Sequence, residues 1–231
     1  MRFRVFRWSP GTAARFEEFP IDLGDGTTVL DALVRLRETR VPDLAFRYAC
    51  RVGMCGSCAM VVNGRERWAC RTRLVRLGAT AVTVRPLYHF PLIRDLVVDM
   101  APFVAKQRLV RGAFVPGARA LESGPSGPSG RAAVDAAIEC IGCGACVSAC
   151  TMVRWDPAFP GPAALNRAFT LAADPRDGGA PARRDALFGE DGVWRCHGQA
   201  QCTAVCPMEL SPTDSILRLR RMAVRSLFLR T

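Results

Sequence analysis

The stretch RYACRVGMCGSC, residues 47–58, places three cysteines in one short loop. Cys50, Cys55 and Cys58 have the spacing C-x4-C-x2-C, and Cys70 follows on the far side of a predicted hairpin. This spacing is typical of the four thiolate ligands of a plant-type [2Fe–2S] cluster. Zinc sites usually combine two compact C-x2-C pairs. The asymmetric pattern therefore favours the cluster over zinc.

Two glycines in the same loop suit this role. Gly53 and Gly56 allow the backbone to pass close to inorganic sulfide and to present its N–H groups to sulfur. Outside the loop, short runs of alternating apolar and polar residues are separated by turn residues, which indicates strands. The predicted strands are Arg2–Trp8, Phe16–Asp22, Ala59–Val62, Arg65–Ala69 and Ala81–Arg85.

One helix is predicted among these strands. In TVLDALVRLRET, residues 28–39, apolar residues recur at helical spacing. Thr28 followed by Asp31 approximates a capping box at the start of this helix. Strands around one helix indicate a small α+β domain that ends near residue 100.

Two more groups of cysteines lie in the second half of the chain. Residues 140–150, CIGCGACVSAC, follow the pattern of bacterial two-cluster ferredoxins, in which the fourth cysteine binds the other cluster. Residues 196–207 repeat this template, with Gln199 at the position of a middle cysteine. The template assigns one [4Fe–4S] cluster to Cys140, Cys143, Cys146 and Cys206. The neighbouring cluster is left with three ligands and is predicted to be [3Fe–4S], bound by Cys150, Cys196 and Cys202.

All eleven cysteines are assigned in this way. An odd number of cysteines in tight groups argues against a disulfide framework. Because cluster ligands must stay reduced, we expect a reducing compartment such as the cytoplasm. The N-terminal residues resemble neither a secretory nor a twin-arginine signal. No apolar run approaches the ~18–20 residues that a membrane-spanning helix needs.

The charge and the remaining residues exclude several classes of function. The formal charge is +11, but the arginines are scattered among apolar segments and no nucleic-acid motif accompanies them, so we expect no nucleic-acid partner. The sequence contains no G-x-G-x-x-G motif, no P-loop and no Ser/His/Asp arrangement; its histidines are His89 and His197. Three clusters without a catalytic constellation predict an electron carrier between partners, because clusters move single electrons.

The second half is predicted to be mainly helix and loop. Helical apolar spacing covers Arg131–Glu139, Pro162–Ala173 and Ser211–Arg230. Residues 123–130, SGPSGPSG, are a low-complexity stretch that cannot build a core.

The cysteine order, together with FPLIRDLVVDM at 90–100 and GPAALNR at 161–167, resembles the iron–sulfur subunits of succinate dehydrogenase and fumarate reductase. The resemblance implies a β-grasp, plant-type ferredoxin-like domain over residues 1–100 and an all-α, bacterial-ferredoxin-like domain over residues 101–231. It also implies electron flow from FAD in a flavoprotein subunit, through the three clusters, to a quinone beside membrane-anchor subunits. The chain would then be held peripherally at the cytoplasmic face of the inner membrane.

The resemblance extends to residues near the third cysteine group. Trp155 matches a tryptophan that the family associates with quinone binding, and His197 matches the histidine beside the first cysteine of that group. Thr151, Met152 and Gln199 depart from the family pattern. The alternatives are that Trp155 is a packed aromatic residue and that His197 is a donor facing the cluster.

Other functions remain open on the sequence. The same series of three clusters could serve a fumarate reductase or a related flavoprotein dehydrogenase, such as a thiol:fumarate reductase. A free-standing soluble ferredoxin would need the apolar stretch at 92–100 and the C-terminal apolar positions as internal core. A structural cluster in a nucleic-acid enzyme lacks any supporting motif.

Overall fold

The computed structural model describes residues 1–21, 24, 26–118 and 134–228, which fall into two compact units. The first unit contains Met1–Met100 and also the short segment Ile141–Ala149. The second unit contains the rest of the described chain. The low-complexity stretch at 123–130 lies outside the described residues.

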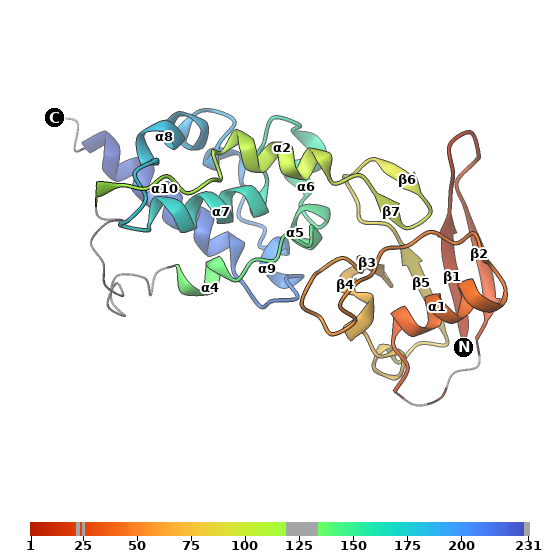
Figure 1. Cartoon of the computed structure of the whole chain (residues 1–231). Helices are drawn as coiled ribbons and strands as arrows, with labels where there is room; N and C mark the ends of the chain where they lie inside the picture. The colour runs from red at the N-terminus through yellow and green to blue at the C-terminus, as the bar shows by residue number, and fades with distance from the viewer. Residues whose placement is uncertain (22–23, 25, 119–133, 229–231) are drawn as a thin grey trace. The chain divides into compact units, whose positions relative to one another are not determined.

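A five-stranded mixed sheet forms the first unit (Figure 1). Its strand order is β2-β1-β5-β3-β4; β1 and β5 are parallel, and the other neighbours are antiparallel. The predicted strands are confirmed with small changes at their ends. The observed strands are β1 (Arg2–Arg7), β2 (Arg15–Pro20), β3 (Ala59–Val62), β4 (Arg65–Trp68) and β5 (Ala81–Arg85).

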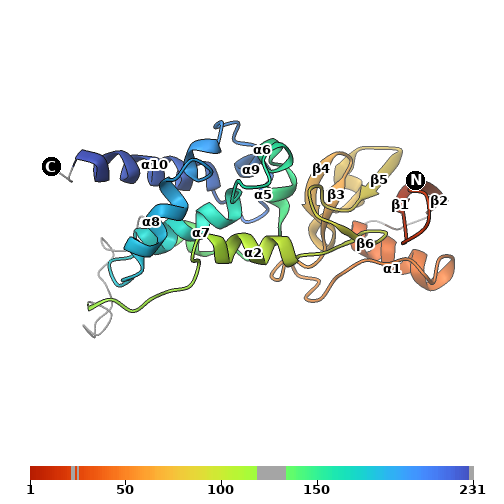
Figure 2. The same ribbon diagram turned by 90° about the horizontal axis from the view of Figure 1, so that it is seen from above.

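Helix α1 (Val29–Thr39) lies beside this sheet (Figures 1 and 2). The predicted capping box is confirmed: the Asp31 N–H donates to Thr28 Oγ1 at 3.2 Å, and the Thr28 N–H donates to Asp31 Oδ2 at 3.0 Å. The apolar side of α1 is buried, including Leu30 and Leu33, and Phe3 of β1 is buried as well. Burial of such side chains stabilises each by about 1.5–3 kcal/mol.

A buried carboxylate fastens the FPLIRDLVVDM stretch to the sheet. This stretch forms a two-stranded hairpin, β6 (Leu92–Arg94) and β7 (Val97–Val98), with Asp95 between the strands. The Asp95 carboxylate accepts hydrogen bonds from Arg7 Nε at 3.0 Å, from the Trp8 N–H at 3.0 Å and from the Ala45 N–H at 2.9 Å. Arg7 and Asp95 are 5% and 2% exposed, so this pair lies in the core of the unit.

The second unit consists of helices around a central helix (Figure 1). Its centre, α7 (Pro162–Ala172), packs against four of the others: α10 (Pro212–Phe228), α8 (Ala180–Phe188), α2 (Ala101–Leu109) and α4 (Asp135–Ile138). Two short helices, α6 (Thr151–Trp155) and α9 (Gln201–Ala204), follow cysteine-bearing segments.

The helices predicted at 162–173 and 211–230 correspond to α7 and α10, with residues 229 and 230 outside the described ranges. Leu165 and Phe169 of α7 pack in one buried cluster with Ile216 and Leu219 of α10. The helices α2 and α8 are not among the predicted ones. Of α8 only Arg183 and Leu187 are buried, and α2 buries no residue. Neither helix has the apolar face that produces a helical pattern in the sequence.

A second buried ion pair organises the loops of this unit. Arg183 donates to both carboxylate oxygens of Asp177 and to the carbonyl oxygens of Arg111 and Ala113. Burial opposes ionisation of Asp177, but the hydrogen bonds from Arg183 and from two backbone N–H groups outweigh it and lower the pKa of this carboxyl group. The backbone of the loop after α2 is therefore held by hydrogen bonds to this charged pair.

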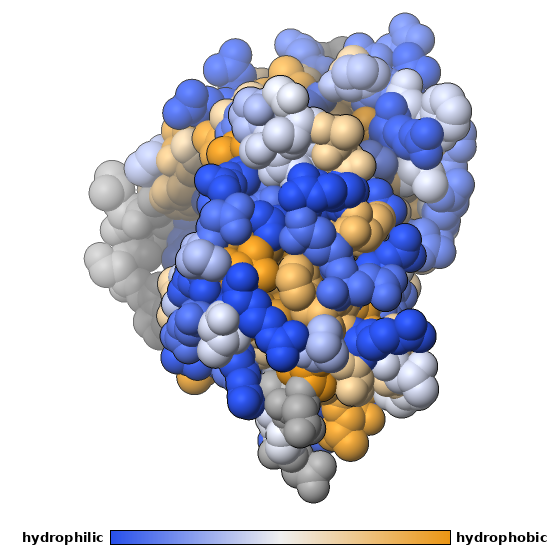
Figure 3. Space-filling model, turned by 90° about the vertical axis from the view of Figure 1, so that its right-hand side faces the viewer, coloured by the Kyte–Doolittle hydropathy of each residue, from blue (hydrophilic) through white to orange (hydrophobic). Residues whose placement is uncertain are grey.

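Among the described helices, none is both long enough and apolar enough to cross a membrane. The face of the molecule in Figure 3 is mostly hydrophilic, and its apolar residues form separate small patches.

Replacing Asp95 by Ala should destabilise the first unit. The change removes three hydrogen bonds and leaves buried Arg7 paired with Glu17 and Asp43 among the described residues. Removing one member of a buried pair costs about 3–5 kcal/mol. Asp43→Ala is the matched control, because the Asp43 side chain is 53% exposed and exposed pairs contribute about 0–1 kcal/mol. Equal shifts of both variants in thermal or urea unfolding would contradict this account.

Candidate iron–sulfur sites

The first candidate site lies in the loop that precedes β3. The N–H groups of Met54 and Cys55 donate to Cys50 Sγ at 3.2 and 3.3 Å, and the Cys50 N–H donates to Cys55 Sγ at 3.5 Å. The backbone curls tightly enough for this because Gly53 and Gly56 have φ of +79° and +69°, a region that favours glycine. Thiolate charge at Cys50 would thus be stabilised by backbone dipoles.

The other two cysteines of this group come from the ends of the β3–β4 hairpin. Cys58 directly precedes β3, and Cys70 lies in the short helix η1 (Ala69–Arg71) that follows β4. The Ala69 N–H donates to the Cys58 carbonyl at 3.1 Å, which keeps the two ends together. Both side chains are buried, at 3% and 7% exposure.

The surroundings of these thiols differ. Burial raises the pKa of Cys58 to about 12; a backbone hydrogen bond at Cys70 opposes this rise, and a side-chain hydrogen bond with Cys70 and the charges of Cys70 and Cys55 add to it. A hydrogen bond from the Ser57 side chain, with backbone hydrogen bonds around it, lowers the pKa of Cys55 to about 6. Cys55, Cys58 and Cys70 are therefore close enough to influence each other electrostatically. Iron would compensate the charge that Cys58 cannot carry alone, so the donor set fits a bound cluster.

The second group is divided between the two compact units. Cys143 and Cys146 belong to the first unit, in the segment that contains the short helix α5 (Ala145–Ser148). Cys140 and Cys206 belong to the second unit. Their common ligation of a [4Fe–4S] cluster stays a prediction from the spacing.

The third group lies within the second unit. Burial is the main cause that raises the pKa of Cys150, and the charges of Cys202 and Cys196 add to it. Burial likewise raises the pKa of Cys202, again with a contribution from Cys196. Each of these three thiols therefore lies within electrostatic range of the other two. The Cys202 sulfur also lies 3.3 Å from Thr213 Oγ1.

The residues predicted beside this group are on the surface. Trp155 is 74% exposed, so it is not a packed core aromatic of this chain. His197 and Gln199 are exposed as well. Gln199 Oε1 accepts a hydrogen bond of 2.7 Å from Thr151 Oγ1, which joins two of the positions that depart from the family pattern.

The sequence did not reveal one residue that holds the backbone of the third cysteine group. Arg220 of α10 donates to the carbonyl oxygens of Val193 and Trp194 at 3.0 and 3.2 Å, and also to that of Cys196. It thereby holds the backbone turn that leads into Cys196. The signal in the sequence was an arginine among apolar helix positions, which does not reveal its partners.

Within the described ranges, no group of three or more His, Cys, Asp or Glu side chains converges on a point suited to one metal ion. A zinc ion requires its ligands about 2.0–2.3 Å from a single centre. The thiolates of an iron–sulfur cluster bind different iron atoms instead, so they are spread around it.

Comparisons with known proteins identify two iron–sulfur domains in this chain. A family profile described as a 2Fe-2S iron-sulfur cluster binding domain matches residues 2–105, and one described as a 4Fe-4S dicluster domain matches residues 136–210. The α+β chain thus has a [2Fe–2S] ferredoxin-type domain followed by a [4Fe–4S] domain.

Two relatives match over most of their length. The succinate dehydrogenase iron-sulfur subunit of Coxiella burnetii is 37% identical, covering 95% of this chain and 95% of its own. The fumarate reductase iron-sulfur subunit of Mycobacterium tuberculosis is 36% identical, covering 95% of this chain and 91% of its own. A chain of the Mycobacterium smegmatis Sdh1 complex in the apo form superimposes with a TM-score of 0.90 at 31% identity, over 98% of this chain and 96% of that one.

Replacing Arg220 by Met should lower the occupancy of the third site. Each lost hydrogen bond from the charged group costs about 1.5–3 kcal/mol, and the turn before Cys196 loses its fixed position. Iron content and the EPR intensity of that centre should fall, while the first centre keeps its intensity. Arg221→Met is the matched control, since the adjacent Arg221 is exposed on the same helix. Full occupancy in the Arg220 variant would show that Cys196 is positioned without it.

Proposed function

This chain belongs to the family of iron–sulfur subunits of succinate dehydrogenase and fumarate reductase, and we propose that it carries electrons between a flavoprotein and a quinone. It is the electron-transfer subunit of an oxidoreductase complex of that family. The observation that carries the proposal is the gathering of its cysteines into three groups along the sequence, supported at the first site by the hydrogen bonds between Cys50 and Cys55.

The domain assignment follows the order of the clusters. Residues 1–100 would form a β-grasp ferredoxin-like domain, which agrees with a mixed sheet crossed by one helix. Residues 101–231 would form an all-α ferredoxin-like domain, although the segment at 141–149 packs with the first unit.

Three clusters would be held by cysteine alone. The [2Fe–2S] cluster would be bound by Cys50, Cys55, Cys58 and Cys70. The [4Fe–4S] cluster would be bound by Cys140, Cys143, Cys146 and Cys206. The [3Fe–4S] cluster would be bound by Cys150, Cys196 and Cys202. When bound, these clusters supply one-electron redox chemistry, and the protein sets their charge, hydrogen bonding and separation.

The chain's own contribution at the first site is electrostatic. Two backbone N–H groups donate to Cys50 Sγ, and hydrogen bonds to thiolate sulfur stabilise added negative charge. The thiolates are partly buried, which opposes such charge. The balance between these effects tunes the potential.

The exit for electrons would lie beside the third site. Exposed Trp155 and His197 would contact a quinone at the junction with membrane-anchor subunits, and exposure leaves both side chains available to a partner. FAD would reside in the separate flavoprotein subunit. The chain would be held by the anchors at the cytoplasmic face of the inner membrane.

The direction of the reaction is proposed as succinate oxidation. Trp155 and His197 carry that choice, because they match residues on the quinone side of succinate-oxidising members. The alternative is fumarate reduction, a name that relatives of similar identity bear.

Replacing Trp155 by Leu should slow quinone reduction and leave cluster reduction by succinate intact. The indole is exposed, so the change removes a contact surface without opening a core cavity. Stopped-flow or freeze-quench EPR separates the two steps. Phe114→Leu is a control at another exposed aromatic residue, 41% exposed and distant in sequence from the cysteine groups. If cluster reduction failed equally in the Trp155 variant, the exit would lie elsewhere.

Replacing Gln199 by Cys should convert the third cluster from [3Fe–4S] to [4Fe–4S]. A neutral carboxamide is a weak ligand beside thiolates, and here its oxygen is engaged by Thr151. A fourth thiolate adds negative charge, so the potential should fall and quinone reduction should slow. EPR of the oxidised protein reports the change, because an oxidised [3Fe–4S] centre is paramagnetic and an oxidised [4Fe–4S] centre is silent.

Gln201→Cys provides the matched control for this conversion. It adds a thiol to the same exposed segment at a position outside the cysteine template. The EPR signal should persist in this control and vanish in the Gln199 variant. A wild-type protein with full iron content and no such signal would refute the [3Fe–4S] assignment.

A further inference from the structure

The segment Ile141–Ala149 carries Cys143 and Cys146, yet it packs in the first unit. Three sets of contacts hold it there, and none of them is made by a proposed ligand sulfur. What these contacts mean for electron transfer rests on the cluster assignments of the proposed function.

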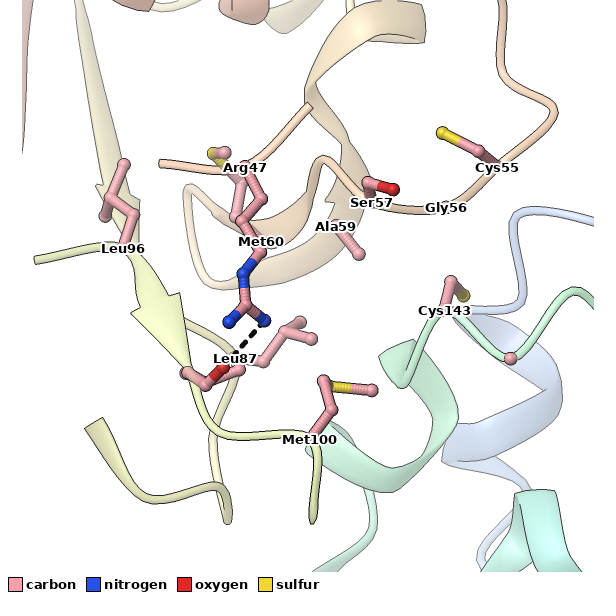
Figure 4. A pocket seen from close by; sticks show the side chains of 12 residues that line it. Arg47, Cys55, Gly56, Ser57, Ala59, Met60, Leu87, Leu96, Met100 and Cys143 are labelled. Carbon is pink, nitrogen blue, oxygen red and sulfur yellow. Dashed lines mark hydrogen bonds between the residues drawn. The ribbon is translucent and has the colours of Figure 1, made fainter. Parts of the chain in front are cut away.

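The first contact joins the two cysteine-bearing loops directly. A Cβ atom added to buried Gly56 would lie 2.5 Å from Cys143 Cβ and 3.1 Å from Cys143 Cα. Gly56 stands between Cys55 and Cys58, so the backbone of the first cluster loop touches a proposed ligand of the second cluster. Figure 4 shows Cys143 facing the Cys55–Gly56–Ser57 stretch beside a pocket of about 210 Å³.

The second contact is made by Gly144, which lies within the segment itself. A Cβ atom added to Gly144 would lie 3.2 Å from Phe90 Cζ and 3.3 Å from Leu87 Cδ1. Gly144 has φ of +82° and begins α5. The segment is therefore in close contact with apolar side chains of the first unit as well as with the Gly56 loop.

The third contact is a buried hydrogen-bonded network. Ser148 Oγ donates to Glu66 Oε1 at 2.7 Å and accepts from the Tyr88 N–H at 2.9 Å. Ser148 and Glu66 are 2% and 6% exposed. Breaking such a bond would leave a buried carboxylate oxygen without its donor, which is costly. The segment is thus attached to β4 by a polar bond that water cannot easily replace.

We propose that Gly56 is a positioning residue for electron transfer between the first and second clusters, and that the Ser148–Glu66 bond holds Cys143 against it. The step moves one electron and neither forms nor breaks a bond. Its rate therefore depends on separation and contact between the two ligand loops. A residue with no side chain at position 56 allows that contact to be as short as two backbones permit.

Gly56→Ala in the intact complex tests this proposal, with Gly64→Ala as the matched control. Both glycines have positive φ, +69° and +75°, so both variants suffer similar backbone strain. Gly64 lies in the turn between β3 and β4, and a Cβ added there would meet no atom within 4 Å. Only the Gly56 variant must push the two loops apart.

The readouts are cluster content, magnetic coupling and transfer rate. Iron and sulfide analysis shows whether both clusters are loaded. The relaxation of the reduced [2Fe–2S] EPR signal, with the second cluster reduced, reports their magnetic interaction. We expect weaker interaction and several-fold slower reduction of the later clusters in Gly56→Ala, with Gly64→Ala unchanged. Equal behaviour of the two loaded variants would overturn the proposal.

If the Gly56 variant loses a cluster, Ser148→Ala tests the same proposal. It removes the donor to Glu66 and adds no atom near Cys143. The magnetic interaction should weaken in Ser148→Ala and stay at the wild-type level in Glu66→Gln, which keeps an acceptor for the hydroxyl. No change in a loaded Ser148 variant would also overturn the proposal. Absence of [2Fe–2S] and [4Fe–4S] signals from the wild type would instead refute the cluster assignments.

Discussion

The loop that carries the first cysteines is constrained by hydrogen bonds from backbone N–H groups to cysteine sulfur. Such bonds require the backbone to curl around the sulfur, as it does where Met54 and Cys55 donate to Cys50. That curl depends on positive φ at Gly53 and Gly56. The β3–β4 hairpin then brings Cys58 and Cys70 to the same place. The sheet and helix of the first unit serve to hold this irregular loop.

Buried ion pairs fix irregular segments in both units. Arg7 with Asp95 fastens the β6–β7 hairpin, and Arg183 with Asp177 fastens the loop after α2. Each carboxylate also accepts backbone N–H groups. A small core buries too little apolar area to hold such loops by packing alone. Buried charges that are fully hydrogen-bonded can hold such loops. Their desolvation penalty is offset by the attraction and hydrogen bonds of their partners.

The third cysteine group lies between buried residues on one side and exposed residues on the other. Cys202 is 8% exposed, whereas Trp155 is 74% exposed. Arg220 ties the Cys196 turn to the core helix α10, so the open side can present His197 and Gln199 from a fixed backbone. A site built in this way can exchange electrons with a partner while its ligands stay in place.

The sequence by itself determined the three cysteine groups, the strands of the sheet and the helices α1, α7 and α10, because local spacing and apolar periodicity specify them. It missed α2 and α8, which bury too few residues to leave a pattern. The ligand sets of the clusters stay predictions from spacing. Only the tertiary structure placed the segment at 141–149 in the first unit and paired Ser148 with Glu66, 82 residues apart. Such contacts depend on how distant segments pack, and no local pattern encodes that.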